Sequence, residues 1–176
     1  MAAVQIARAL NATVIAVVNS PEKAAIARKN GATHVIDTTV LDLRSTFNAE
    51  VADITQGHGA DVVLDQVGGA LFHACLSAIA RFGRLVVVGF ASGDLPKFKG
   101  DAIMEKSVSV LGLQVSDYRD REPEKLRLAW QHLVGWFIEG KINPQVMSTY
   151  PLQNAAAALN AVKQGLVLGK VVLTIR

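Results

Sequence analysis

The segment from Asp61 to Gly93 constrains the fold more than any other part of the sequence. Two short apolar runs, DVVLDQVGG and RLVVVGFASG, enclose a segment of helical length, LFHACLSAIARF. Each run is rich in valine and leucine and predicts a strand buried on both faces. Because the apolar residues between the runs recur at helical spacing, the three pieces predict a β-α-β unit with parallel strands. Open α/β sheets bind ligands where the carboxyl ends of such strands meet.

The same alternation of strands and helices continues through the chain. Further strands are predicted at Thr13–Asn19, His34–Asp37 and Val108–Val115, with an extended piece that ends at Tyr150 and a closing strand in KVVLTI. Further helices are predicted at Ala2–Leu10, Pro21–Asn30, Ser45–Gln56, Glu122–Glu139 and Leu152–Lys163. This alternation is typical of an α/β fold with a doubly wound parallel sheet. We interpret the apolar stripe of the helix Glu122–Glu139, with Trp130 and Phe137, as part of the core.

Residues with strong end preferences mark several helix termini. Ser20 is predicted to cap the helix that begins at Pro21, since serine before proline is a common start. Asn11 and Gly31 follow the first two helices and can adopt the left-handed conformation that ends a helix. Residues 116–121 are interpreted as a charged link.

Composition excludes several classes of protein. The chain has 176 residues, of which 51% are apolar and 19% are charged, so it can bury a sizeable core. The formal charge is only +3 and the basic residues are interleaved with acids. The sequence therefore does not indicate a basic surface that would bind nucleic acid or an anionic membrane. No apolar run approaches the roughly 20 residues needed to span a bilayer, and no signal peptide is recognised. We therefore expect a soluble, cytoplasmic protein.

Cysteine and histidine give no sign of a metal site. Cys75 is the single cysteine, which excludes an internal disulfide and a cysteine-rich zinc site within this chain. Its place on the apolar stripe of a helix favours a small buried hydrophobe over a reactive thiol. The four histidines are scattered without the spacing of metal ligands, so no metal is expected.

The end of the strand Thr13–Asn19 carries the residues that choose between nicotinamide cofactors. In dinucleotide-binding folds an acid at this position bonds the ribose hydroxyls of NAD, whereas cationic and neutral polar groups accommodate the 2′-phosphate of NADP. Here Asn19 and Ser20 end the strand, Lys23 lies one turn on, and no acid precedes Glu22. The pattern favours NADP. In the alternative interpretation, Ser20 is simply a helix cap and Lys23 is a solvated side chain.

Several segments together resemble a known family. They are AAVQIARALNATVIAVVNSPEKAAIARKNGATHVID, ADVVLDQVGG, GRLVVVGFASG, YPLQNAAAAL and GKVVLTI. In this order they are similar to the zinc-independent quinone oxidoreductase branch of the medium-chain dehydrogenase/reductase superfamily. The resemblance implies a Rossmann-like fold whose first strand, glycine-rich turn and catalytic domain would lie upstream. Residues 1–142 would then be an incomplete dinucleotide-binding domain, and residues 143–176 would pack on the catalytic domain.

The resemblance also implies cofactor-binding positions. It assigns Asn19, Ser20 and Lys23 to the 2′-phosphate of NADPH, and places Thr38 beside the adenine, where related reductases often have a tyrosine. Gln66 and Val67 would line the adenosine side, Val88, Gly89 and Phe90 would approach the nicotinamide riboside, and Leu113 would border the nicotinamide. Gly169 and Lys170 match the closing GK of the family.

The implied activity is NADPH-dependent hydride transfer to a quinone or another conjugated carbonyl. No catalytic residue is assigned within this chain, because any proton donor is expected upstream, and the isolated chain is expected to turn over weakly or not at all. The edge strand Val108–Val115 is expected to pair in a homodimer. Three alternatives stay open: a non-catalytic nucleotide-binding or assembly module, an enoyl-thioester reductase, and a fragment of a zinc-type alcohol dehydrogenase.

Overall fold

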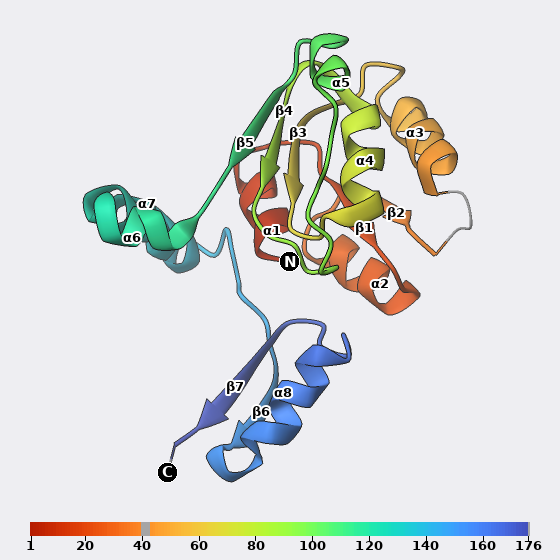
Figure 1. Ribbon diagram of the computed structural model, residues 1–176. Helices are drawn as coiled ribbons and strands as arrows, with labels where there is room; N and C mark the ends of the chain where they lie inside the picture. Colours follow the sequence, from red (N-terminus) through yellow and green to blue (C-terminus); the bar gives the residue numbers. More distant parts are fainter. Residues whose placement is uncertain (40–42, 176) are drawn as a thin grey trace. The chain divides into compact units, whose positions relative to one another are not determined.

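The computed structural model describes residues 1–39 and 43–175, which group into two compact units (Figure 1). Residues 1–35 and 130–176 form the first unit, and residues 36–129 form the second. Each unit has its own strands and its own buried apolar side chains. The predicted domain boundary after residue 142 stays a prediction.

The first unit contains the amino-terminal helices and a carboxyl-terminal β-α-β unit. Its elements are α1 (Ala2–Ala9), β1 (Ile15–Val18), α2 (Pro21–Lys29), β6 (Val146–Pro151), the 3-10 helix η1 (Leu152–Asn154), α8 (Ala155–Lys163) and β7 (Lys170–Thr174). Strands β6 and β7 pair in parallel, with α8 between them in the chain. A small core that includes Val14, Ala16 and Ala27 packs against Val4 and Ala7 of α1.

The second unit is built on a three-stranded parallel sheet in the order β3-β4-β5. Its elements are α3 (Leu43–Ile54), β3 (Ala60–Asp65), α4 (Gly69–Ala78), β4 (Ile79–Val87), α5 (Gly100–Met104), β5 (Ser109–Gly112) and α6 (Val115–Arg121). Two elements belong partly to each unit: β2 (His34–Asp37), which pairs with β1, and α7 (Pro123–Ile138). The predicted α/β class with parallel, Rossmann-like strand pairing is confirmed.

Helix α4 supplies the main apolar side chains of the second unit and lies beside α3 (Figure 1). Phe72 of α4 and Leu85 of β4 are completely buried, and Phe47 and Val51 of α3 are also buried. Cys75 belongs to the buried side of α4, as its place on the apolar stripe predicts. The segment from β3 to β4 therefore forms the predicted β-α-β unit and its core.

The face of the β3-β4-β5 sheet that carries Val62 and Leu64 is only partly covered. Val62 and Leu64 of β3 are 47% and 53% exposed, and Leu111 of β5 is 44% exposed. The register places Leu64 beside Val86 and Val86 beside Leu111, so these side chains share one face. The prediction that both apolar runs are buried on both faces is therefore wrong for β3. A continuous apolar run does not reveal whether the described chain supplies the second covering layer.

The predicted helix LFHACLSAIARF is also shorter than its periodicity suggests. Helix α4 ends at Ala78, and residues 79–82 already belong to β4. Ile79 pairs with Ala60 of β3 and is almost completely buried, so tertiary burial overrides the helical spacing. Phe82 has a φ of 62° in the irregular stretch where the register between β3 and β4 shifts.

Strand β5 lies inside the predicted strand Val108–Val115. Two predictions about the chain after β5 were wrong. Residues 116–121, predicted as a link, belong to helix α6, which begins at Val115, the last residue of the predicted strand. Helix α7 forms as predicted, but Trp130 is 66% exposed and Phe137 is 56% exposed. The interpretation of this stripe as core is therefore wrong for the described chain, because helical spacing shows only which side chains share a face.

The predicted helix termini are confirmed where the sequence marks them. The Ser20 hydroxyl accepts a hydrogen bond of 3.2 Å from the backbone N–H of Lys23, which caps α2. Asn11 and Gly31, which follow α1 and α2, have φ values of 59° and 103°.

None of the described helices combines the length and the apolar character that crossing a membrane requires.

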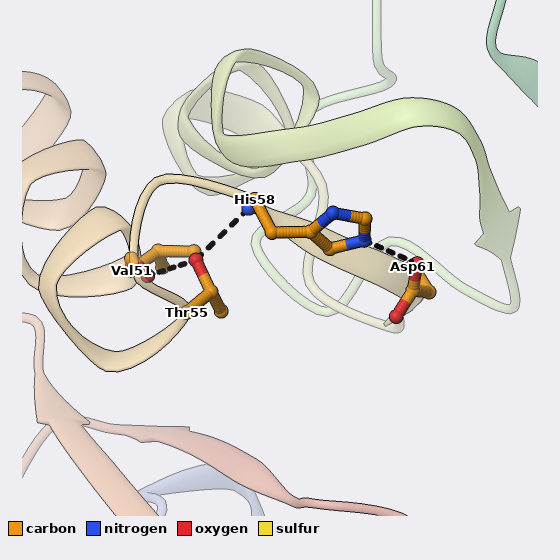
Figure 2. Close-up of polar contacts among 5 residues, drawn as sticks. Val51, Thr55, His58 and Asp61 are labelled. Atoms are coloured by element: carbon orange, nitrogen blue, oxygen red, sulfur yellow. Dashed lines mark hydrogen bonds and ion pairs between the residues drawn. The ribbon is translucent and has the colours of Figure 1, made fainter.

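The turn that leads from α3 into β3 is held by side chains of its own (Figure 2). The Thr55 hydroxyl donates to the Val51 carbonyl at 2.7 Å and accepts from the Gly59 N–H at 2.9 Å. His58 Nε2 lies 2.8 Å from Asp61 Oδ1, and both side chains are exposed. Gly59 has a φ of 92°, and a Cβ there would lie 2.8 Å from the Ala80 nitrogen, so only glycine fits.

Candidate functional site

The carboxyl ends of β3, β4 and β5 lie level with one another. Asp65 pairs with Val87, and Val87 pairs with Gly112. Beyond the regular strands, the Val88 N–H donates to the Asp65 carbonyl at 2.7 Å, and the Leu113 N–H donates to the Val87 carbonyl at 2.9 Å. The structure therefore brings six of the predicted cofactor-binding residues to one edge of the second unit: Gln66, Val67, Val88, Gly89, Phe90 and Leu113.

The loops after β3 and β4 are joined by backbone hydrogen bonds. The Ala91 N–H donates to the Gln66 carbonyl at 3.0 Å, and the Ser92 N–H donates to the Val67 carbonyl at 2.9 Å. Gly68 has a φ of 74°, and a Cβ there would lie 2.6 Å from the Asp94 carbonyl oxygen. The two loops therefore form one connected rim that requires glycine at its closest approach.

The buried side chain of Asp65 stabilises this rim through hydrogen bonds to its backbone. Its side chain is 3% exposed, and Oδ1 accepts from the N–H groups of Val67 at 2.9 Å and Gly68 at 3.0 Å. Oδ2 has no hydrogen-bond partner among the described residues. The carboxylate thus holds the turn that begins α4. This role was not predicted, although an aspartate directly before a QVGG turn suggests it.

A groove of about 660 Å³ opens beside this edge. Four of the predicted residues line it: Val88, Gly89, Phe90 and Leu113. The opposing wall comes from α6 and the start of α7, with Asp117, Tyr118, Glu122 and Lys125. Gln66 and Val67 belong to the rim and are not among the lining residues. This wall was not predicted, because residues 116–121 have the charge pattern of a link.

The charged groups of this wall are paired. Asp117 Oδ1 lies 3.0 Å from Arg121 Nε, and Glu122 Oε1 lies 3.2 Å from Lys125 Nζ. The Tyr118 hydroxyl has no hydrogen-bond partner in the described part of the chain. The groove therefore combines an apolar floor at the strand ends with a polar wall in which one neutral O–H donor is available.

The residues predicted to bind the 2′-phosphate form a cluster in the first unit. Lys23 Nζ donates to Asn19 Oδ1 at 2.7 Å, and Ser20 caps α2 directly beside them. Hydrogen bonds from its own backbone N–H and then from the Ser20 side chain lower the pKa of the exposed Glu22 carboxyl. The helix-cap interpretation of Ser20 is confirmed, and the phosphate role stays a prediction. Thr38 directly follows β2.

No group in the described residues suggests metal or thiol chemistry. Among them, no set of three or more histidine, cysteine, aspartate or glutamate side chains could hold a metal ion. Burial, and then the nearby Asp65 carboxylate, raise the pKa of the Cys75 thiol to about 12, so this thiol stays protonated at neutral pH.

Comparison with known proteins gives a consistent family. The family model for zinc-binding dehydrogenases matches residues 1–131. A quinone oxidoreductase-like protein 2 homolog of Nematostella vectensis is 33% identical over 86% of this chain and 41% of that protein. A quinone oxidoreductase of Pseudomonas aeruginosa is 33% identical over 89% of this chain and 47% of that protein. The chain thus spans somewhat less than half the length of these relatives.

A solved structure agrees with these relatives. The crystal structure of the Escherichia coli quinone oxidoreductase in complex with NADPH superposes with a TM-score of 0.85 at 29% identity. The match covers 98% of this chain and 52% of the Escherichia coli chain.

Proposed function

The chain belongs to the zinc-binding dehydrogenase family, as the resemblance to medium-chain dehydrogenases predicted, and from this premise we propose that it binds NADPH for a quinone or enone reductase. In this proposal the chain is the cofactor-binding part, and hydride passes to a quinone or another conjugated carbonyl. Its quinone oxidoreductase relatives, one of them solved with NADPH, support the proposal.

The choice of NADPH over NADH depends on the cluster of Asn19, Ser20 and Lys23. The Lys23 ammonium and the amide of Asn19 lie within 2.7 Å of each other at the start of α2, where backbone N–H groups and the helix dipole favour an anion. No carboxylate stands at the end of β1 to bond ribose hydroxyls. This is the observation that carries the cofactor assignment.

The groove in the second unit is suited to the nicotinamide end. Gly89 and the apolar side chains of Val88, Phe90 and Leu113 offer a surface for a flat ring, and a ring bound there would displace water from them. When bound, NADPH would supply the hydride, and this chain would position the ring and a polarised carbonyl beside it.

Fluorescence titration of the chain with NADPH and NADH tests the cofactor assignment. We expect NADPH to bind about tenfold or more tightly, because its extra phosphate gains charge-assisted hydrogen bonds. Equal affinity, or a preference for NADH, would remove the assignment of the 2′-phosphate. Menadione-dependent oxidation of NADPH by the natural gene product then tests the quinone.

We also propose that β5 pairs with its counterpart in a homodimer. The strand is at the end of the β3-β4-β5 sheet, and Ser109, Leu111 and Gly112 are exposed. An exposed strand edge invites pairing with another chain. Light scattering should give twice the chain mass at micromolar concentration, and a monomer would contradict this arrangement.

The rival function, a non-catalytic assembly module, has one observation in its favour. The exposed face with Val62, Leu64 and Leu111 offers apolar surface to a partner. A different exposed surface supports the leading proposal. In the first unit, Val146 and Ile175 are exposed on and beside the β6-β7 pair, which supports packing of residues 143–176 on a catalytic domain. NADPH binding at micromolar concentration would argue against a purely structural role.

A further inference from the structure

Tyr118 is held in the groove wall by backbone contacts that begin at the strand end. Leu113 continues the pairing of β5 with β4, and α6 begins at once after Gln114. The N–H of Tyr118 donates to the Gln114 carbonyl at 3.4 Å. Tyr118 therefore lies one helical turn beyond Gln114, lines the groove that Gly89 also lines, and is 39% exposed.

The other polar groups of this wall are poorly suited to an oxygen that gains negative charge. The carboxylates of Asp117 and Glu122 would repel such an oxygen, and they already pair with Arg121 and Lys125. The phenol is neutral and can donate a hydrogen bond without breaking an ion pair. Gln114 also lines the groove, but its side-chain amide is far too weak an acid to give up a proton. Among the described side chains that line the groove, Tyr118 carries the single hydroxyl.

Reduction of a conjugated carbonyl requires such a donor. Resting on the function proposed above, we propose that the Tyr118 hydroxyl binds the carbonyl oxygen of the substrate and delivers a proton to it. As the β-carbon of the substrate gains the hydride, the double bond shifts and the carbonyl π pair moves onto the oxygen. The Tyr118 O–H bond breaks as the new O–H bond forms on the substrate, and water returns a proton to the phenolate.

The composition of the chain allows a direct test, because Tyr118 and Tyr150 are its two tyrosines. The chain is labelled with tyrosine carrying carbon-13 at Cζ, saturated with NADP⁺ and titrated with menadione. We expect the Tyr118 signal, assigned by its loss in Tyr118→Phe, to shift saturably while the Tyr150 signal stays constant. A Tyr118 signal that does not respond, whether or not menadione binds elsewhere, would overturn the inference.

Affinity provides the second measurement. Tyr118→Phe should weaken menadione binding about fivefold to tenfold, the effect of one lost hydrogen bond, and leave NADPH affinity within about twofold. Tyr150→Phe is the matched control and should change neither. Equal menadione affinity of Tyr118→Phe and the unsubstituted chain would contradict the role.

The two proposals fail in different ways. A chain that binds NADPH but shows no Tyr118 response keeps the proposed function and loses this inference. A chain that does not bind NADPH loses the proposed function, and with it the inference.

Discussion

The side-chain amide of Gln5 and the backbone of Asn143, which are 138 positions apart, bond each other twice. Gln5 Nε2 donates to the Asn143 carbonyl at 2.9 Å, and the Asn143 N–H donates to Gln5 Oε1 at 2.9 Å. Gln5 also donates to Asn30 Oδ1 and is only 8% exposed. One buried amide thus connects α1, the end of α2 and the segment that leads to β6.

Replacement of Gln5 by alanine should destabilise the chain by about 2–3 kcal/mol, because buried partners lose their hydrogen bonds. Urea unfolding followed by circular dichroism measures the change. Gln153→Ala removes an exposed glutamine and should cost less than about 0.5 kcal/mol. Equal effects of the two substitutions would show that the Gln5 contacts contribute nothing to stability.

Replacement of Ser20 by aspartate should reverse the cofactor preference while α2 keeps its cap, because aspartate caps helices as well as serine does. The new carboxylate would repel the 2′-phosphate and can bond ribose hydroxyls. NADPH affinity should fall about tenfold or more, and NADH affinity should rise, as measured by fluorescence titration.

Replacement of Lys23 by alanine should weaken NADPH binding about tenfold and leave NADH binding unchanged, because only NADPH carries the phosphate that the ammonium meets. Lys29→Ala, at the other end of α2, is the matched control. A similar loss in both variants would point to general charge attraction and not to a specific site.

Replacement of Asp65 by alanine should destabilise the second unit by about 2–4 kcal/mol, because the N–H groups of Val67 and Gly68 lose their buried acceptor. Asp65→Asn keeps an acceptor oxygen and should cost less. Asp61→Ala, which breaks only the exposed pair with His58, should cost at most about 1 kcal/mol. Thermal unfolding of the three variants gives the order, and an Asp61→Ala effect as large as that of Asp65→Ala would contradict it.

The buried thiol of Cys75 should make stability fall in alkaline solution. Its pKa is raised from 9.0 to about 12 in the folded chain, so only the unfolded chain releases this proton between those values. The part of the folding stability that depends on the protonated thiol is therefore fully present below pH 9 and is lost as the pH rises towards 12. Cys75→Ser should reduce this part of the pH dependence, and urea unfolding at several pH values measures it. An identical alkaline loss in the variant would assign it to other groups.

Much of the candidate site could be predicted because its signals are local. The glycines and the apolar runs of the segment 61–93 mark the strand ends, and Ser20 with Pro21 marks the start of α2. Since the carboxyl ends of parallel strands meet at one edge, strand assignment predicts that Gly89 lies there. The positions of Gln66 and Leu113 came from the family resemblance.

Other features depend on which side chains are covered, and the sequence could not show this. The stripe with Trp130 and the face with Leu64 have the periodicity of core residues, but both are exposed in the described chain. Likewise, residues 79–82 look helical and become extended because their neighbour in space is β3.

The sequence by itself determined the α/β class, the termini of α1 and α2 and the carboxyl ends of β3 and β4, since each depends on backbone preferences within a few residues. Only the tertiary structure decided the partners of Gln5, the burial of Asp65 and the place of Tyr118 in the groove. Those contacts join segments that chain folding brings together, and a local pattern holds no information about the distance between them.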